Sequence, residues 1–287
     1  MRKLASIPVR ARQLQLEAMG VNKGTQLLLG QSWRESFRVE QRARPFEDVE
    51  FRSYSQNGED GILHYIFSLI GAGSRRCVEI CAGSGIQCNS TNLIINHGWN
   101  GLLFDGNSQL IAKGRRFFSI HPDTSAFPPQ LVNAWITSDN INELISAAGV
   151  QGEVDLLSLD MDGIDWWVWD RIDVIRPRVV VAEVQIILGP DASLTVPNDP
   201  SFRAEFADGC GIYCGASIAA FVKLARRKGY RLVGCQRYGF NAFFLRDDVG
   251  AEIFPEVPAA NCFRHPFAQW AQDRFYPRVK DRPWVEV

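Results

Sequence analysis

Acidic side chains follow two apolar segments of this 287-residue sequence. The segment 154–160 ends in Asp160, Asp162 follows two residues later, and Glu183 lies near the end of the β-branched segment 179–184. Carboxylates gathered in one crevice can remove a proton from a hydroxyl group. They can also hold a hard divalent cation that lowers the pKa of such a group. Both chemistries require the two segments to end side by side.

A glycine-rich turn follows another apolar segment, 77–80, and is the second candidate site. Its glycines are Gly83 and Gly85, and a helix pattern begins shortly after them. A strand, a tight glycine turn and a helix let the main chain approach a ligand closely. The next apolar segment ends in Asp105, and an acid at that position suits ribose hydroxyls. This context favours a nucleotide-type cofactor site.

The segments that must position these residues alternate between strand and helix patterns. Strands are expected at about 77–80, 101–105, 131–136, 154–160 and 179–184, with helices between them, among them 90–96 and 108–118. Such alternation predicts parallel pairing with right-handed crossovers and helices on both faces. Ligands bind beyond the carboxyl ends of such strands. We therefore expect one crevice to collect the glycine turn, Asp105, Asp139, Asp160, Asp162 and Glu183.

The last two strand patterns, 230–234 and 241–246, follow a clear helix over 216–227. The turn between them is so short that the two strands must pair antiparallel. The predicted fold class is therefore α/β: a Rossmann-like, mostly parallel sheet of seven strands with an antiparallel closing strand and helices on both faces.

Three other parts surround this predicted domain, which spans 51–250. Residues 1–50 carry no strand pattern and are expected to be a helical lead-in, with a helix over 10–19 that ends at Gly20. The irregular segment 186–211 follows the fifth strand, so we expect it to be an insertion that covers the substrate side of the crevice. The aromatic tail 251–287 can be a packing arm, a dimer contact or part of a lid.

Some motifs have a structural and a functional interpretation, and the sequence leaves both open. In the polar turn 51–60, Asn57 can cap a helix, or Tyr54 and Gln56 can reach over a ligand. Asp162 can instead cap the helix that follows it. The tryptophans of that helix can pack in the core or stack on a sugar or other ring; they are Trp166, Trp167 and Trp169.

Composition narrows the function classes. Apolar residues make up 46% of the chain, charged residues 22%, and the net charge is −1, which does not favour nucleic-acid binding. No apolar run is long enough to span a bilayer, and the basic N-terminus lacks a signal core, so we expect a cytoplasmic protein that binds no membrane. The seven cysteines are interpreted as small buried thiols in a reducing cytoplasm. A zinc site at Cys210 and Cys214 is disfavoured, because no second cysteine pair or histidine cluster has the spacing that one requires.

Four motifs together resemble class I S-adenosylmethionine-dependent methyltransferases, and more closely the FkbM-type members. Residues 79–85 read EICAGSG, 54–60 read YSQNGED, 155–163 read DLLSLDMDG and 213–217 read YCGAS. The resemblance covers about 51–246. It departs at Cys81, where the family has the first glycine of its turn. Cysteine is small, so the turn can be kept provided that this position does not need a positive φ.

The resemblance implies roles for individual residues. Glu79 and the main chain at Gly83 and Gly85 would hold the methionine end of the cofactor, with Gln56 as a further contact. Asp105 would bind the ribose. The remaining assignments place Asp139 near the adenine and Asp160 near the sulfonium or the substrate.

The leading hypothesis is therefore O-methylation of a hydroxyl on a sugar, glycan or secondary metabolite, with S-adenosylmethionine as cofactor. Asp160, Asp162 and Glu183 are the candidate catalytic residues, with or without Mg²⁺ or another divalent cation. The alternative is a non-catalytic Rossmann-like module that binds a nucleotide or a partner. An NAD-linked oxidoreductase is disfavoured by the antiparallel closing pair and the acid in the first strand. N-methylation and the oligomeric state stay open.

Overall fold

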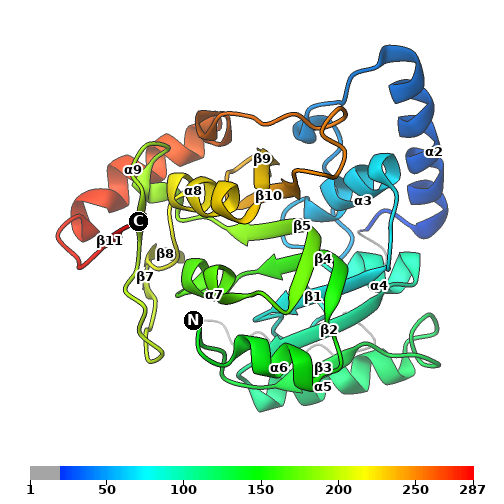
Figure 1. Cartoon of the computed structure of the whole chain (residues 1–287), viewed down its shortest axis with the longest axis horizontal. Coiled ribbons are helices and arrows are strands. Elements are labelled where there is room, and N and C mark those ends of the chain that lie inside the picture. The colour runs from blue at the N-terminus through cyan, green and yellow to red at the C-terminus, as the bar shows by residue number, and fades with distance from the viewer. Residues whose placement is uncertain (1–19) are drawn as a thin grey trace.

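The computed structural model describes residues 20–287, so the helix expected over 10–19 lies outside the described residues. At its centre is a seven-stranded sheet with the strand order β3-β2-β1-β4-β5-β10-β9 (Figure 1). The strands are β1 (Arg76–Ile80), β2 (Asn100–Asp105), β3 (Gln130–Asn133), β4 (Gly152–Leu159), β5 (Ile175–Glu183), β9 (Tyr230–Cys235) and β10 (Asn241–Arg246).

Five neighbouring strands of this sheet, β3 to β5 in the spatial order, are parallel. Strand β10 runs antiparallel between β5 and β9. The predicted fold class is thus confirmed, with the antiparallel strand inside the sheet and β9 at its edge. β3 ends three residues earlier than expected, because β2, its one partner within residues 20–287, ends at Asp105 opposite Asn133.

Helices cover both faces of the sheet because successive strand residues point to opposite sides. One apolar core forms under α2 (Lys23–Glu40), α3 (Glu59–Ile70), α4 (Thr91–His97) and α5 (Ser108–Ile120). The other forms under α6 (Ile141–Ala147), α7 (Asp165–Arg171), α8 (Ile218–Lys228) and α9 (Pro266–Val279). Val179 and Val180 of β5 are fully buried in opposite cores, as expected for a strand covered on both faces.

The insertion 186–211 contains short elements. They are η2 (Ile186–Leu188), β6 (Leu194–Thr195), β7 (Glu205–Ala207) and the start of β8 (Cys210–Tyr213); two further 3-10 turns, η1 (Phe46–Asp48) and η3 (Ala259–Phe263), lie elsewhere. β7 and β8 form an antiparallel hairpin, and β11 (Val285–Glu286) pairs with β6. In Figure 1 the tail elements α9 and β11 lie beside this insertion. The tail therefore packs against the insertion, which is the first of the three roles left open for it.

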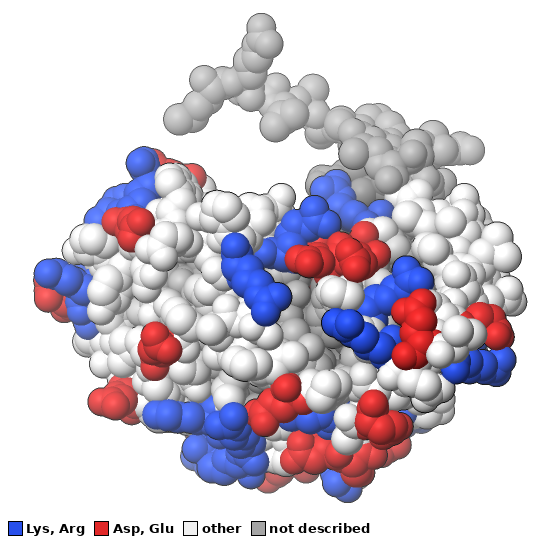
Figure 2. Space-filling model, turned by 90° about the horizontal axis from the view of Figure 1, so that it is seen from above, with Lys and Arg blue, Asp and Glu red and all other residues white. Residues whose placement is uncertain are grey.

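Two surface properties bear on the sequence expectations. Lys and Arg are interspersed with Asp and Glu on the face seen from above, in keeping with the near-zero net charge (Figure 2). Among the helices of residues 20–287, none combines the length and the hydropathy that crossing a bilayer requires.

Candidate functional site

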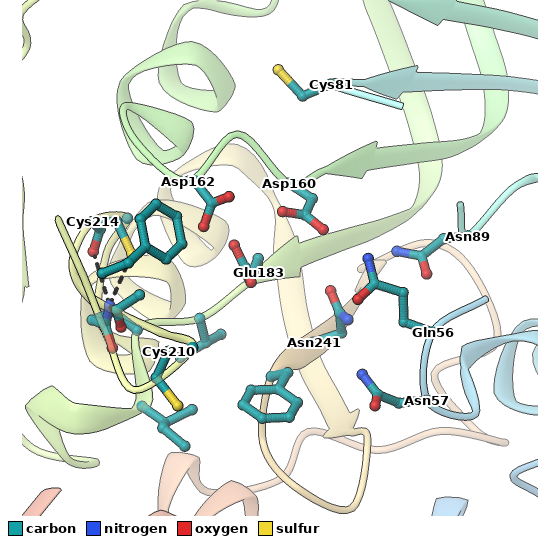
Figure 3. A pocket seen from close by; sticks show the side chains of 18 of the residues that line it. Gln56, Asn57, Cys81, Asn89, Asp160, Asp162, Glu183, Cys210, Cys214 and Asn241 are labelled. Atoms are coloured by element: carbon teal, nitrogen blue, oxygen red, sulfur yellow. Dashed lines mark hydrogen bonds between the residues drawn. The ribbon is translucent and has the colours of Figure 1, made fainter. Parts of the chain in front are cut away.

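A cavity of about 460 Å³ opens at the carboxyl ends of β1, β4 and β5 (Figure 3). Gln56 and Asn57 line it from the loop before α3, and the turn after β1 lines it from the sheet. Asn241, the first residue of β10, lies beside the acids. The insertion, the residue before β10 and the tail helix α9 add four aromatic rings: Phe206, Phe240, Phe267 and Phe275.

The structure brings most of the predicted site residues to this cavity. The six that line it are Gln56, Glu79, Gly83, Asp160, Asp162 and Glu183. Gly85, Asp105 and Asp139 do not line it. Asp105 is half-buried at the tip of β2, and Asp139 is exposed before α6. The convergence expected from the strand ends is therefore seen for β1, β4 and β5 but not for the tips of β2 and β3.

Asp160, directly after β4, and Glu183, the last residue of β5, lie side by side and interact as a carboxyl pair (Figure 3). Burial raises the pKa of Asp160 to about 7 and raises the pKa of Glu183 well above its usual range. At Glu183 the charge of Asp160 is the next cause of the increase in pKa. Two carboxyl groups this close cannot both ionise easily, so they share one proton near neutral pH. Such a pair can accept a proton from a bound hydroxyl.

Asp162 points into the cavity, while its neighbour Asp165 stabilises the turn after β4. Asp165 accepts hydrogen bonds from the main-chain N–H groups of Met161 and Gly163, at 2.7 and 3.0 Å. Helix α7 begins after Ile164 without a side-chain cap, so Asp162 does not have the capping role considered for it. Burial raises the pKa of Asp162, which makes it a third carboxyl group that can act on a ligand (Figure 3).

Glu79 lines the cavity, yet its carboxylate is engaged within the protein. It accepts hydrogen bonds from the main chain at Asn89 and Ser90, both at 2.8 Å, and from Ser158 at 3.3 Å. These bonds connect β1 and β4 to the start of α4. The side chain is only 3% exposed, so Glu79 positions the loop that faces the cavity.

The two glycines of the turn have different surroundings. Gly83 has a φ of 59°, and an added Cβ would meet no atom within 4 Å, so it faces open space. At Gly85, where φ is 68°, a Cβ would lie 2.7 Å from Leu103 and 3.0 Å from Phe118. Gly85 is thus required by packing beneath the turn. The Gly83 N–H donates to Asp105 at 2.8 Å, which connects the tip of β2 to the turn.

Cys81 adopts a left-handed conformation, with a φ of 61°. The condition under which cysteine would replace glycine freely is therefore not met. Non-glycine residues lose about 1 kcal/mol in this region, because Cβ approaches the following carbonyl oxygen. The turn thus places a residue with a side chain in a conformation that favours glycine.

We predict that Cys81→Gly will be more stable than Cys81→Ala by about 1 kcal/mol, the reverse of the usual order of these residues. Alanine keeps the strained Cβ, whereas glycine removes it, and both lose the thiol. Urea unfolding of the two variants at equal m-value measures the difference. A more stable alanine variant would show that the backbone at this position carries no strain.

The loop before α3 is held from within by two buried acids. Asp60 accepts N–H bonds from Ser53, Tyr54 and Ser55 at 2.6–2.7 Å. Glu59 accepts N–H bonds from residues 57 and 58 at 2.9–3.0 Å. Helix α3 begins after Gly58 without a side-chain cap, so the expected capping role of Asn57 is wrong. The loop presents Gln56 and Asn57 to the cavity, whereas Tyr54 is buried outside it.

The insertion is attached to the site by side chains of the sheet domain. Gln185 donates to the Gly211 carbonyl at 3.1 Å and to the Cys214 thiol at 3.0 Å. Trp167 donates to the Val196 carbonyl at 2.8 Å. Trp166 and Trp169 are buried in the core. The tryptophans therefore pack and anchor, and the aromatic face of the cavity comes from phenylalanines that the sequence did not single out.

Asn241 is the other site residue that sequence reasoning missed. It is opposite Glu183 in the β5–β10 register. Its only sequence signal is a polar residue at the start of an apolar strand pattern, which becomes meaningful once the pairing of β5 and β10 is known.

No group of three or more His, Cys, Asp or Glu side chains in residues 20–287 is arranged to hold a metal ion. The site carboxylates thus give no support to a divalent cation. All seven cysteines are free thiols, including Cys210 and Cys214 at the cavity.

Neither a protein-family model nor a curated protein matches this chain. Among solved structures it is similar to the N-terminal domain of EvdMO1 with SAH bound, at 13% identity and a TM-score of 0.43, over 75% of this chain and 94% of that one. A methyltransferase from Clostridium acetobutylicum gives 9% identity and 0.40, over 73% and 94%. The glycopeptide N-methyltransferase MtfA with SAM gives 11% and 0.40, over 66% and 92%. Similarity this distant concerns the fold alone, so the chemistry must come from the site.

Proposed function

We propose that this protein is an S-adenosylmethionine-dependent methyltransferase that methylates a hydroxyl group of a sugar, glycan or secondary metabolite. The observation that carries the proposal is the Asp160–Glu183 pair, which lines the same cavity as the open glycine turn. The strand order of the sheet, in which antiparallel β10 lies beside β5, is a second observation that supports the proposal. The motifs at 54–60, 155–163 and 213–217 support a closer kinship with FkbM-type enzymes.

The glycine turn fits the proposed cofactor. Gly83 offers open space to a ligand, and Gln56, Asn57 and Asn89 add amide groups around it. The cofactor would supply an electrophilic methyl group when bound. Asp105 would hold the ribose, since each of its oxygens accepts one N–H and keeps a second lone pair. Asp139 stays the proposed neighbour of the adenine.

The chain's own contribution to the reaction is alignment and proton removal. Alignment within the cavity can lower the barrier by several kcal/mol, because donor and acceptor no longer have to find each other. The carboxyl pair accepts the proton that the acceptor hydroxyl must lose, and Asp162 lies close enough to orient the acceptor (Figure 3).

Calorimetric titration with S-adenosylmethionine, S-adenosylhomocysteine and NAD tests the proposal. We expect micromolar binding of the first two and none of NAD, followed by transfer of a labelled methyl group to a hydroxylated acceptor. Binding of NAD alone would overturn the proposal. Binding of none of the three would favour a non-catalytic module.

Replacing Asp105 with Ala should weaken S-adenosylhomocysteine binding by about 10- to 100-fold, the range expected when hydrogen bonds to a charged group are lost. The variant loses the ribose acceptor and also releases Gly83. Asp173→Ala is a matched control, because Asp173 is exposed and precedes β5, at the opposite edge of the sheet. Unchanged affinity in the Asp105 variant would make the ribose assignment wrong.

A further inference from the structure

The cavity has many hydrogen-bond acceptors and no cationic side chain. Among residues 20–287, those that line it include Glu79, Asp160, Asp162 and Glu183 but no Lys, Arg or His. A phosphate or carboxylate that brings no cationic group of its own into this space would face several acids without a counter-charge. Like charges in such a desolvated site cost several kcal/mol. The methionine end of the proposed cofactor differs, because it carries an ammonium group beside its carboxylate.

Asn241 adds an acceptor whose orientation is determined by a neighbour. Its Nδ2 donates to Glu59 Oε1 at 2.9 Å, and a carboxylate there can only accept. The amide oxygen must then face the other way. That oxygen is buried and has no hydrogen-bond partner among the described residues, although the residue lines the cavity and is only 7% exposed.

A buried carbonyl oxygen without a partner is costly, since the loss of its hydrogen bond to water is not compensated. The Asn241 amide oxygen lies beside Glu183 of the neighbouring strand, because the register of β5 and β10 places Asn241 opposite this acid. Asn241 Oδ1 and the carboxyl oxygens of the site acids therefore form one surface of hydrogen-bond acceptors (Figure 3). A ligand that fits this surface must supply N–H or O–H donors.

Aromatic rings complete the cavity. Phe240 and Phe267 pack edge to face, with ring centroids 5.3 Å apart, and Phe206 and Phe275 also line the space. Aromatic rings suit the apolar C–H face of a sugar ring, and the polar acceptors suit its hydroxyl and amine groups.

We propose that the acceptor is a neutral or amine-bearing sugar without any anionic group, anchored by a donated hydrogen bond to Asn241 Oδ1. The inference rests on the proposed function, which it deepens by naming the charge and the donor pattern of the substrate. Sugar phosphates and sugar acids are excluded by the same surface.

Four probes that share one ring skeleton test the proposal: glucose, glucosamine, glucuronate and glucose 6-phosphate. Binding to the full chain is followed by ligand-observed NMR at pH 7.5, with and without S-adenosylhomocysteine. We expect glucose and glucosamine to bind at least 10-fold more tightly than either anion. Equal or tighter binding of an anion overturns the proposal, and so does binding of none of the four.

Glu59→Gln tests the role of Asn241 directly, since Glu59 is what fixes its amide. The new amide can keep its oxygen on the N–H groups of residues 57 and 58 and donate to Asn241 Oδ1. Asn241 would then turn its NH₂ group into the cavity. We expect the preference for glucose over glucose 6-phosphate to fall at least threefold, without any change in the lining residues.

Glu47→Gln is the matched control, because it makes the same chemical change at an exposed acid outside the cavity. An unchanged preference in a folded Glu59→Gln variant overturns the role of Asn241. The S-adenosylhomocysteine titration separates the two proposals. If the protein binds no cofactor but prefers the uncharged and amine-bearing sugars as expected, only the methyltransferase proposal is rejected. If the protein binds the cofactor but does not prefer these sugars, only the inferred acceptor is rejected.

Discussion

Asp160→Asn should lower kcat for methyl transfer by about 10²- to 10⁴-fold, the usual contribution of a general base. The amide cannot take a proton, and it donates to Glu183 and so occupies the oxygen that would otherwise act on the acceptor. Single-turnover measurements with labelled S-adenosylmethionine give the rate of the chemical step. Affinity for S-adenosylhomocysteine, measured in parallel, separates an effect on catalysis from an effect on cofactor binding.

Two further variants sharpen this test. Glu183→Gln removes the other member of the pair, and a comparable loss is expected if the two carboxyl groups act as one unit. Asp173→Asn makes the same change at an exposed acid outside the cavity and should leave turnover unchanged. Wild-type turnover in Asp160→Asn would remove Asp160 from the catalytic residues.

The same substitution should stabilise the protein at high pH. Burial raises the pKa of Asp160 to about 7 in the folded state, above its value of 3.8 in an unfolded chain. A folded protein that binds protons more strongly than its unfolded chain loses stability as pH rises, here from about 4 to about 7. Asn does not titrate and avoids this loss.

The expected gain in the free energy of unfolding is near zero at pH 4 and on the order of 1–3 kcal/mol at pH 8. The gain should be smaller than the free energy that corresponds to the full pKa shift, because solvent at the open side of the cavity screens the charge. Urea unfolding of wild type and variant at pH 4, 6 and 8 measures the difference. A gain of equal size at every pH would mean that packing, rather than titration, causes it.

The wild-type protein should also lose stability as pH rises, because Asp160 is not its only buried acid with a raised pKa. Burial also raises the pKa values of Asp60 and Asp165 to about 6. Both acids hold loops that face the cavity. Keeping these acids buried therefore lowers the free energy of unfolding at neutral pH, where they must ionise. An inactive but more stable Asp160 variant is the behaviour expected when a functional site opposes stability.

Much of the fold could be predicted from local patterns, because strands and helices leave different periodicities in the sequence. The β-branched run around Val180 indicates a strand buried on both faces, and the short turn before Asn241 requires antiparallel pairing. Acids at the strand ends could be assigned to one crevice, since parallel strands end at the same edge of a sheet. Asp160, Asp162 and Glu183 were found in this way.

What the sequence by itself determined is therefore the sheet, its strand directions and the acids at its carboxyl edge. Only the tertiary structure decided which polar groups are left for a ligand, because hydrogen bonds between distant segments use up some acceptors and spare others. Glu79 and Asp165 are engaged by main-chain N–H groups, whereas Asn241 keeps a free oxygen because Glu59 holds its other end. The left-handed backbone at Cys81 and the phenylalanines of α9 likewise depend on packing between segments far apart in the chain.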